Sequence, residues 1–308
     1  MSHITLTRRA VLGSAAALPL AGIAGTSARA AAPMLGAATT RFNRVTLGEF
    51  EVTTLLAATM PRPDPHTIFG LNVTAEEFAE ASAAHNIPTD QAQFFFTPTV
   101  INTGAELVLF DTGLNPDAIT GALAAAGYTP DQVDVVVITH MHGDHIGGLT
   151  GEGGSVTFPN ARYVTASTEF DHWAGASNEN FEAKMRPLAE KTEMIGDGAS
   201  VASGITAMSA PGHTPGHTAY MIESAGKSLV IAADFANHYV WSLGYPDWEV
   251  KFDMDKAQAA VTRRKVLDML ATDKVPFIGY HMPFPAVGYV ETRGDGFQYV
   301  PSSYQLML

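Results

Sequence analysis

The strongest constraint on this chain is a run of four potential metal ligands within six residues. They are His140, His142, Asp144 and His145, and they follow the apolar stretch 133–138, which reads as a buried strand. Burying several imidazoles and a carboxylate together at a strand end costs free energy, and a purely structural role would not offset that cost. They suit a borderline-soft divalent ion such as zinc. The rest of the fold is therefore expected to complete a metal site around this run.

The composition limits both the ligands and the partners of such a site. The chain has 308 residues, contains no cysteine and carries a formal net charge of −13. Without cysteine there can be no disulfide, thiolate nucleophile or iron–sulfur cluster, so histidine and carboxylate must hold any metal. The acidic charge and the lack of a basic run disfavour nucleic acid and anionic membrane surfaces as partners.

The first 30 residues have the pattern of a targeting segment. Arg8 and Arg9 precede the apolar stretch 11–24, and residues 28–30 offer a small-x-small cleavage site. The stretch is too short for a spanning helix. We predict that residues 1–30 are a twin-arginine signal peptide, which would direct the folded protein to the periplasm or outside the cell. A membrane anchor and a disordered tail are the alternatives, and no membrane association is expected after cleavage.

A small-residue linker at 31–40 leads into a single predicted domain, residues 41–308. Helices are expected at 74–85, 116–126, 167–174, 179–190 and 254–271, with a further one starting at 146–149. Strands or hairpins are expected at 41–56, 94–101, 107–110, 133–138, 161–165, 205–208, 218–223, 228–233, 275–279 and 288–304. Residues 58–72 read as a proline-rich loop, and the basic residues of 254–271, Arg263 among them, as a solvent-facing side. The order of elements predicts a layered α/β domain.

Three more candidate ligands follow predicted strands. His213 comes after 205–208, Asp234 after 228–233 and His281 after 275–279. A lone histidine or aspartate is ordinarily structural, but α/β folds bring strand ends together at one edge of a sheet, where ligands bind. We therefore expect all three to join the run at 140–145.

The ligands divide into two sets. His140 and His142, two residues apart in an extended segment, can point the same way and form a three-imidazole site with His213. Asp144 and His145 belong with His281, and Asp234 can bridge the two sets. Such a site would hold two divalent ions about 3.5–4 Å apart around a shared hydroxide. Asp144 and Asp234 are the expected catalytic carboxylates, with Asp234 orienting the hydroxide and relaying its proton.

Read in chain order, the His-x-His-x-Asp-His run at 140–145, Gly212-His213-Thr214, Asp234 and His281 resemble the metallo-β-lactamase superfamily. The resemblance covers the whole predicted domain and implies a four-layer αβ/βα sandwich with two divalent metal ions, zinc being the expected ion. Asp111 begins a turn that in the superfamily supports a ligand imidazole, although a simple turn cap is the alternative. The family ligand is the first histidine of the pair 213 and 217, so His217 is expected to support the site.

Segments 158–161, 210–218, 281–288 and 296–301 look like the methyl-parathion-hydrolase and lactonase-like group of that superfamily. That group places aromatic pocket residues near Trp173 and Phe181, whose alternative role is in the core, and His238 is a further pocket candidate. Lactonases of the group carry a tyrosine three residues after the bridging aspartate, where this chain has Asn237. The resemblance therefore leaves the substrate open.

The expected function is an exported dinuclear zinc hydrolase of a neutral ester-like bond in a small molecule. A lactone, a carboxyl ester and a phosphotriester all remain open, as does a homodimer. The alternatives are a glyoxalase II-like thioesterase and a di-iron or di-manganese redox centre. Residues 282–308 lack the helical glutathione-binding region of glyoxalase II, and the absence of cysteine and of a flavin motif weighs against redox chemistry. True β-lactamases lack the bridging carboxylate that Asp234 supplies.

Overall fold

The computed structural model describes residues 34–302 and residue 308, so the predicted signal peptide lies outside the described residues. The chain divides between Ala38 and Thr39, inside the predicted linker, and every helix and strand below belongs to the second part. In the portion of the chain that is described, no helix has the length and apolar character needed to cross a bilayer.

The first of two seven-stranded sheets has the order β1-β2-β5-β6-β7-β8-β9. Its strands up to β6 pair antiparallel, and β6 to β9 pair parallel. Its members are β1 (Phe42–Leu47), β2 (Phe50–Leu55), β5 (Thr99–Asn102), β6 (Leu107–Phe110), β7 (Val135–Val137), β8 (Arg162–Ala166) and β9 (Thr192–Ile195).

The second sheet runs in sequence order from β10 to β16, and only the β13–β14 pair is parallel. Its members are β10 (Ser200–Ala202), β11 (Ile205–Ser209), β12 (Thr218–Ser224), β13 (Lys227–Ala233), β14 (Phe277–Gly279), β15 (Val287–Arg293) and β16 (Gly296–Pro301). The hairpins predicted at 41–56, 218–233 and the C-terminal end are therefore confirmed.

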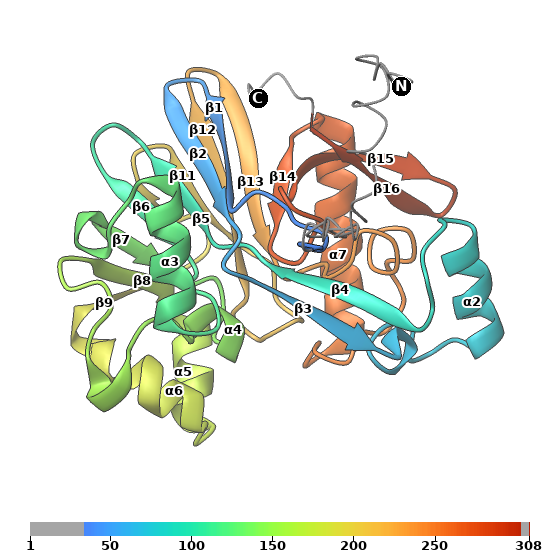
Figure 1. Ribbon diagram of the computed structural model, residues 1–308, viewed down its shortest axis with the longest axis horizontal. Coiled ribbons are helices and arrows are strands. Elements are labelled where there is room, and N and C mark those ends of the chain that lie inside the picture. Colours follow the sequence, from blue (N-terminus) through green and yellow to red (C-terminus); the bar gives the residue numbers. More distant parts are fainter. Residues whose placement is uncertain (1–33, 303–307) are drawn as a thin grey trace, which may run out of the picture. The chain divides into compact units, whose positions relative to one another are not determined.

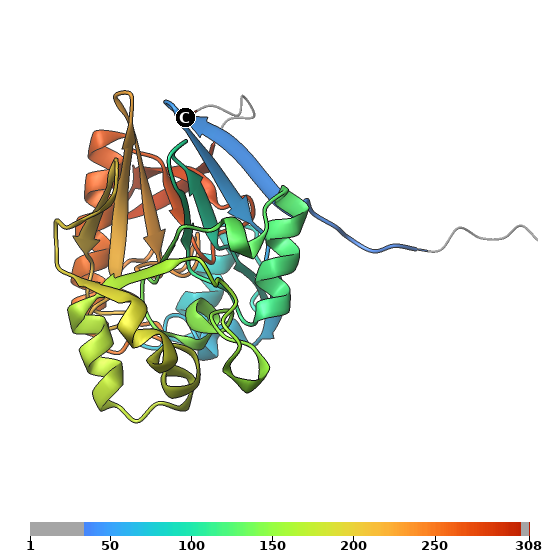
Figure 2. The ribbon, with the colours of Figure 1, turned by 90° about the vertical axis from the view of Figure 1, so that its left-hand side faces the viewer.

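The two sheets pack face to face, and helices cover their outer sides. Successive strand residues point to opposite faces, so Val135 and Val137 join the core between the sheets while Val136 packs under the helices of the first sheet. Those helices are α3 (Pro116–Ala126), α5 (Ser167–Gly175) and α6 (Glu179–Lys184), and α7 (Lys256–Asp273) covers the second sheet. In Figures 1 and 2 the strands lie between α3 and α7. The predicted four-layer αβ/βα sandwich is confirmed.

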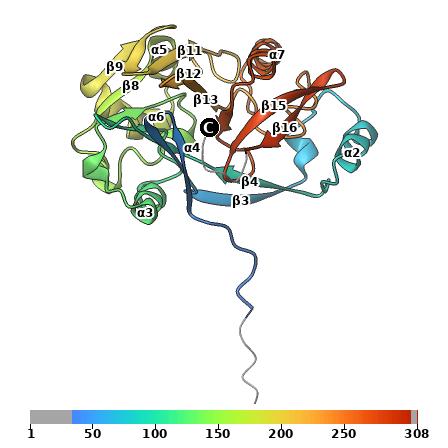
Figure 3. The ribbon, with the colours of Figure 1, turned by 90° about the horizontal axis from the view of Figure 1, so that it is seen from above.

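A two-stranded ribbon, β3 (Ala58–Pro63) paired with β4 (Gln91–Phe96), lies outside both sheets and runs toward α2 (Ala75–Ala83) (Figures 1 and 3). The prediction of a loop at 58–72 was wrong here. β3 pairs with β4 alone, and an edge strand tolerates prolines because their missing N–H groups leave no ladder bond unmade. The single strand predicted at 94–101 is two strands, β4 and β5, in different sheets.

Two further predictions need correction. The helix expected at 146–149 is α4 (Gly143–Ile146), which ends where the prediction began. The glycines after it are packed closely, since a Cβ on Gly147 or Gly148 would lie 2.2 Å from a backbone oxygen. Arg263 of α7 is fully buried rather than solvent-facing. Short 3-10 turns complete the fold: η1 (Pro65–Thr67), η2 (Pro130–Gln132), η3 (Glu152–Gly154) and η4 (Arg186–Lys191).

Candidate metal centre

The seven candidate ligands meet at one edge of the sandwich, although they come from segments far apart in the chain. The segment after β7 and the short helix α4 contribute four of them, and the loop between β11 and β12 contributes one. The ends of the adjacent parallel strands β13 and β14 contribute the last two. The residues are His140, His142, Asp144, His145, His213, Asp234 and His281.

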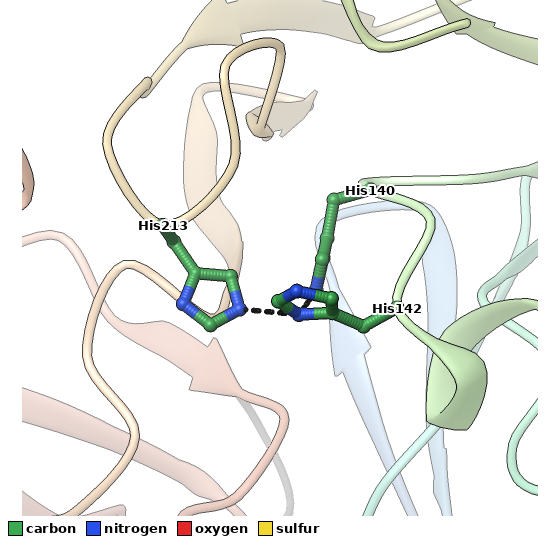
Figure 4. A group of neighbouring side chains, drawn as sticks. All are labelled: His140, His142 and His213. Atoms are coloured by element: carbon green, nitrogen blue, oxygen red, sulfur yellow. Dashed lines mark hydrogen bonds between the residues drawn. The ribbon is translucent and has the colours of Figure 1, made fainter. Parts of the chain in front are cut away.

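His140, His142 and His213, which we call the histidine half, direct three ring nitrogens toward one point (Figure 4). His142 Nδ1 lies 3.1 Å from His140 Nε2 and 2.9 Å from His213 Nε2. The three side chains come from two separate loops, so the convergence is produced by the tertiary fold.

The hydrogen bonds around the histidine half leave lone pairs facing one another. His213 Nδ1 donates to Asp253 Oδ1 at 2.9 Å, so its Nε2 carries no proton when the ring is neutral. The Thr139 hydroxyl donates to Asp111 and is 3.2 Å from His140 Nδ1, which must donate to it. His140 Nε2 is then also an acceptor. Facing acceptors of this kind are satisfied by a cation.

Asp144, His145 and His281, which we call the mixed half, combine a carboxylate with two imidazoles. Asp144 Oδ2 lies 3.6 Å from His145 Nε2 and 3.3 Å from His281 Nε2. His145 Nδ1 donates to Asp111 Oδ2 at 2.8 Å, and its Nε2 is buried with no hydrogen-bond partner among the described residues. A buried nitrogen aimed at carboxylates and left without a partner fits a metal ligand.

Asp234 lies between the two halves. Its Oδ2 atom is 3.5 Å from His213 Nε2 in the histidine half and 3.5 Å from His145 Nε2 in the mixed half. It is also 3.1 Å from His281 Nε2. Its other oxygen, Oδ1, is buried and has no hydrogen-bond partner in the described part of the chain. The position is suited to a carboxylate shared by two cations.

The two halves differ in their electrostatics. In the histidine half, burial and the neighbouring His213 lower the pKa of His142 to about 3. In the mixed half, burial alone would lower the pKa of His281, but Asp234 and Asp144 raise it to about 10. The pKa of His145 is likewise held well above its usual value by Asp234, Asp111 and Asp144, against the effect of burial. The carboxylates around the mixed half thus favour the protonated form of its two imidazoles.

Asp111 stands where the sequence predicts a support for a ligand. Its backbone is left-handed, with φ 60°. Its carboxylate accepts from Thr139 N–H at 2.9 Å, from the Thr139 hydroxyl at 2.8 Å and from His145 Nδ1 at 2.8 Å. The last bond fixes which nitrogen of His145 faces the centre.

Both ring nitrogens of His217 are used by the backbone. Nδ1 donates to the Ala210 carbonyl at 3.0 Å, and Nε2 accepts the N–H of Asp234 at 3.0 Å. Because burial lowers the pKa of His217 to about 3, the ring stays neutral and can play both roles. The geometry gives His217 the task of positioning Asp234 and leaves it no nitrogen for a metal.

Glu169 of α5 ties the two histidine-bearing loops together and was missed from the sequence. Its Oε1 accepts from Met141 N–H at 2.8 Å and Trp173 Nε1 at 2.6 Å. Its Oε2 accepts from the Thr214 hydroxyl at 2.7 Å and Gly216 N–H at 2.9 Å. The only sequence signal was its spacing, four residues before Trp173 on one helical face.

Asp253 and Arg263 form a second support that the sequence did not reveal. Asp253 Oδ2 accepts from Arg263 Nη2 at 2.7 Å while Oδ1 holds His213. Arg263 also donates to the carbonyls of Phe235 and Pro246 at 3.0 and 2.7 Å. This buried ion pair fixes His213 from behind, and an arginine in a run of basic helix residues gave no hint of it.

A cavity of about 460 Å³ opens beside the candidate ligands. Its walls include the aromatic rings of Phe94, Phe96 and Phe252, together with Leu114. The polar residues Arg62, Asn180 and Lys184 line it as well. Its position next to both halves makes it the candidate substrate site.

None of the predicted pocket residues, Trp173, Phe181 and His238, lines this cavity. Phe181 is fully buried in the core beneath the first sheet, where it packs on Phe170. Trp173 is also buried: its ring meets His142 edge-on and its N–H is bonded to Glu169. His238 lines a neighbouring cavity on the other side of β4, which it shares with His281.

A family comparison identifies the same region. The model of the metallo-beta-lactamase superfamily matches residues 97–279, which is more than half of the chain. These residues contain six of the candidate ligands, and His281 lies two positions beyond the matched range.

Two curated relatives that resemble the chain are both N-acyl homoserine lactonases. An N-acyl homoserine lactonase from Bacillus sp is 26% identical over 153 residues, which cover 50% of this chain and 58% of the relative. Another from Bacillus thuringiensis is 27% identical over 115 residues, covering 37% and 43%. The chain thus spans about half the length of the curated relatives it matches.

Solved structures share the fold over most of their length. The dizinc quorum-quenching lactonase AidC has a TM-score of 0.78 at 24% identity, covering 86% of this chain and 98% of that one. The hydrolase AbOPH has a TM-score of 0.79 at 23% identity, covering 87% and 100%.

Proposed function

Because this chain belongs to the metallo-beta-lactamase superfamily, we propose that it is a metal-dependent hydrolase of small ester-like molecules. The observation that carries the proposal is the buried Nε2 of His145, which has no hydrogen-bond partner among the described residues and faces Asp144 and Asp234. Leaving a buried polar atom unpaired costs about 1–3 kcal/mol. A bound cation would remove that cost.

The donor set fits two divalent ions, and zinc suits it best. Imidazole and carboxylate are the ligands that zinc accepts when cysteine is absent. The histidine half would hold one ion and the mixed half the other, with Asp234 shared between them. When bound, such ions lower the pKa of water and polarise a carbonyl or phosphoryl oxygen.

The residues of the chain prepare the site for hydrolysis. Asp234 is held by Asn237 Nδ2, which donates to its Oδ2 at 3.0 Å. Its Oδ2 also lies 3.1–3.5 Å from His281, His145 and His213, so the carboxylate is placed to orient the attacking water and to relay its proton. Phe94 and Phe96 give the cavity an apolar wall beside the candidate ligands. Asp111 and Asp253 hold the ligand imidazoles with their free nitrogens inward.

We propose a lactone as the substrate class. The relatives that match at 26–27% identity are named N-acyl homoserine lactonases. Asn237 occupies the place where the sequence comparison expects the lactonase tyrosine, and its amide is already bonded to Asp234. Another residue of the cavity would therefore have to donate to the substrate oxygen. For this reason we expect the acyl part of the lactone to differ from that of the N-acyl homoserine lactones.

A panel of substrates tests the proposal. The zinc-loaded protein without residues 1–30 is offered an acyl lactone, a simple aryl ester, an aryl phosphotriester and a β-lactam. We expect the lactone to give the highest kcat/KM. A phosphotriester rate above the lactone rate would replace the proposed substrate, and no hydrolysis of any of the four would reject the activity.

Replacement of Asp144 tests the division of the site. Asp144→Ala should remove the ion of the mixed half and lower kcat by on the order of 10²–10³-fold, because the second charge-stabilising centre is lost. Metal content and turnover are measured together. Asp171→Ala, at an exposed residue of α5, is the matched control. An unchanged metal content with unchanged turnover would contradict the assignment.

We also propose that residues 1–30 are a twin-arginine signal and that the hydrolase acts in the periplasm or outside the cell. The support is the sequence pattern around Arg8 and Arg9. Cell fractionation of the full chain, with both arginines replaced by lysine for comparison, is the measurement. Equal export of both forms would reject the twin-arginine route.

A further inference from the structure

We infer that the cavity beside the metal centre selects substrates that carry a carboxylate in addition to the bond to be cleaved, and that Arg62 and Lys184 bind this carboxylate. The inference rests on the proposed function, since it assigns the substrate class of the same site. Neither residue is a candidate metal ligand, and each comes from an element, β3 or α6, that supplies no ligand.

The register of the β3–β4 ribbon places Arg62 toward the cavity. Residues directly opposite in an antiparallel pair share a face, and side chains two apart on one strand share it too. Met60 pairs with Phe94 and Arg62 pairs with Ala92, so Arg62 lies on the same face as Phe94. Phe94 and Arg62 both line the cavity. The orientation therefore follows from the backbone and does not depend on one side-chain rotamer.

The guanidinium of Arg62 is available to a ligand. Among residues 34–302, Arg162 and Arg264 pair with carboxylates, whereas Arg62 has no carboxylate oxygen within 4.0 Å. Its side chain is exposed. A guanidinium presents two parallel N–H groups that match the two oxygens of a carboxylate.

Lys184 supplies a second positive charge from the far end of α6. Its Nζ donates to the Thr150 carbonyl at 2.6 Å, which holds the half-buried side chain in place and leaves two N–H groups free. The nearby Glu182 pairs with Arg186 instead, with an N···O distance of 2.8 Å. Within the described chain, Lys184 therefore has no carboxylate partner at 4.0 Å or less.

The charge of this cavity is opposite to that of the protein. The chain carries a formal net charge of −13. Among the described residues, the only carboxylates that line the cavity are Asp144 and Asp234, and both are candidate metal ligands. With these two engaged by metal, the remaining charges are those of Arg62 and Lys184. A positive cleft in an acidic protein concentrates anionic ligands.

The rest of the lining limits what else the substrate contains. Phe94, Phe96, Phe252 and Leu114 form an apolar wall next to the two cations. A substrate that fits would have an apolar acyl portion against this wall and a carboxylate directed at Arg62 and Lys184. Its lactone or ester group would then lie at the metal centre.

A matched pair of lactones tests the inference. One has an acyl chain ending in a carboxylate, and the other has the methyl ester of that carboxylate. The holoenzyme should prefer the carboxylate form in kcat/KM. Arg62→Met and Lys184→Met should each lower kcat/KM for the carboxylate form roughly tenfold, the size expected for one charge-assisted hydrogen bond. The methyl ester should lose less than the carboxylate form, because it keeps a carbonyl acceptor for these side chains but has no negative charge.

Control variants separate charge from structure. Arg62→Lys and Lys184→Arg keep the positive charge and should retain most of the preference. Arg41→Met and Lys191→Met remove exposed charges that do not line the cavity and should leave both substrates unaffected. Raising the salt concentration should reduce the preference of the wild type, because exposed charges are screened.

A binding measurement distinguishes failure of this inference from failure of the proposed function. A lactam analogue with the same carboxylate should bind the wild type roughly tenfold more tightly than Arg62→Met, by calorimetry. If the wild type cleaves neither lactone, the proposed function fails and the lactam result alone decides the inference. If it cleaves both equally, or if the variants lower both rates alike, the inference is overturned and the hydrolase assignment stands.

Discussion

The histidine half and the mixed half of the metal centre are neighbours built by different means. The histidine half joins two loops, and burial and neighbouring rings lower the pKa of His140 and His142. In the mixed half, Asp144 and His145 are adjacent in the chain. Burial alone would lower the pKa of His145 and His281, but Asp234 and Asp144 raise it.

Each half depends on a different buried carboxylate. Glu169 holds the two loops of the histidine half through three hydrogen bonds. Asp111 orients His145 in the mixed half through one bond and fixes the segment before His140 through two more. If the halves are independent, damage to one support should weaken one ion more than the other.

The largest effect is expected from Glu169→Gln. The glutamine amide would place an N–H₂ group against two buried donors, so the free energy of unfolding should fall by about 2–4 kcal/mol. The ion of the histidine half should be lost first on dilution or chelation. Chemical denaturation and metal analysis are the measurements.

Glu182→Gln is the matched control for this prediction, because Glu182 is exposed and, within residues 34–302, forms an ion pair with Arg186 alone. It should change stability by less than about 1 kcal/mol. Loss of the mixed-half ion first in Glu169→Gln would show that the halves are not supported as described.

A smaller effect, on the other half, is expected from Asp111→Asn. Asparagine tolerates the left-handed backbone but cannot accept all three hydrogen bonds. Affinity for the ion of the mixed half should fall about 10–100-fold, the usual result of removing a partner that orients a ligand. Stepwise metal titration followed by calorimetry is the measurement.

Asp131→Asn, on the exposed turn η2, is the control for the Asp111 variant. Its metal titration should match the wild type. An equal loss of both ions in Asp111→Asn would mean that Thr139 transmits the change to His140, and the comparison between the halves would then fail.

The smallest effect concerns His238, a buried histidine outside both halves. Burial lowers the pKa of His238 to about 3, and the charge of His85 contributes. The unfolded chain binds this proton below about pH 6.5, whereas the folded protein does not. Stability should therefore fall as pH drops from about 6.5 toward 3, by about 1 kcal/mol per pH unit from this residue.

His238→Asn keeps an acceptor for the N–H groups of Val240 and Trp241, which His238 Nδ1 accepts at 3.1 Å. In this variant the slope of stability against pH should be shallower by that amount, measured by urea unfolding at several pH values. His172→Asn on α5 serves as the control. An unchanged slope in His238→Asn would mean that burial alone does not keep this ring neutral.

The candidate ligands could be predicted because each lies in a short sequence pattern that can be recognised by itself. The run at 140–145 is contiguous, and His213, Asp234 and His281 each follow a strand, so a pattern of strands was enough to bring them together. The supports could not be predicted in this way. Glu169 accepts from backbone N–H groups of two distant loops, and no residue type marks such groups in a sequence.

The elements around the cavity were the hardest to predict. β3 contains Pro61 and Pro63, which argue against a strand until it is known to be an edge strand with one partner. Trp173 is a large aromatic residue near the site, and only its bond to Glu169 shows that it supports His142 from the core. Local patterns report what a residue prefers, whereas pocket lining depends on which side of an element meets which neighbour.

Because the chain has no cysteine, the metal centre would also have a role in stability. His140 and His142 follow a strand of the first sheet, while His213, Asp234 and His281 follow strands of the second. Ions shared by these residues would act as cross-links between the two sheets, closing long loops that no disulfide closes. Cross-links of this kind restrict the unfolded chain and stabilise the fold through its entropy. The same ions that would support hydrolysis would then also hold the two sheets together at that edge of the fold.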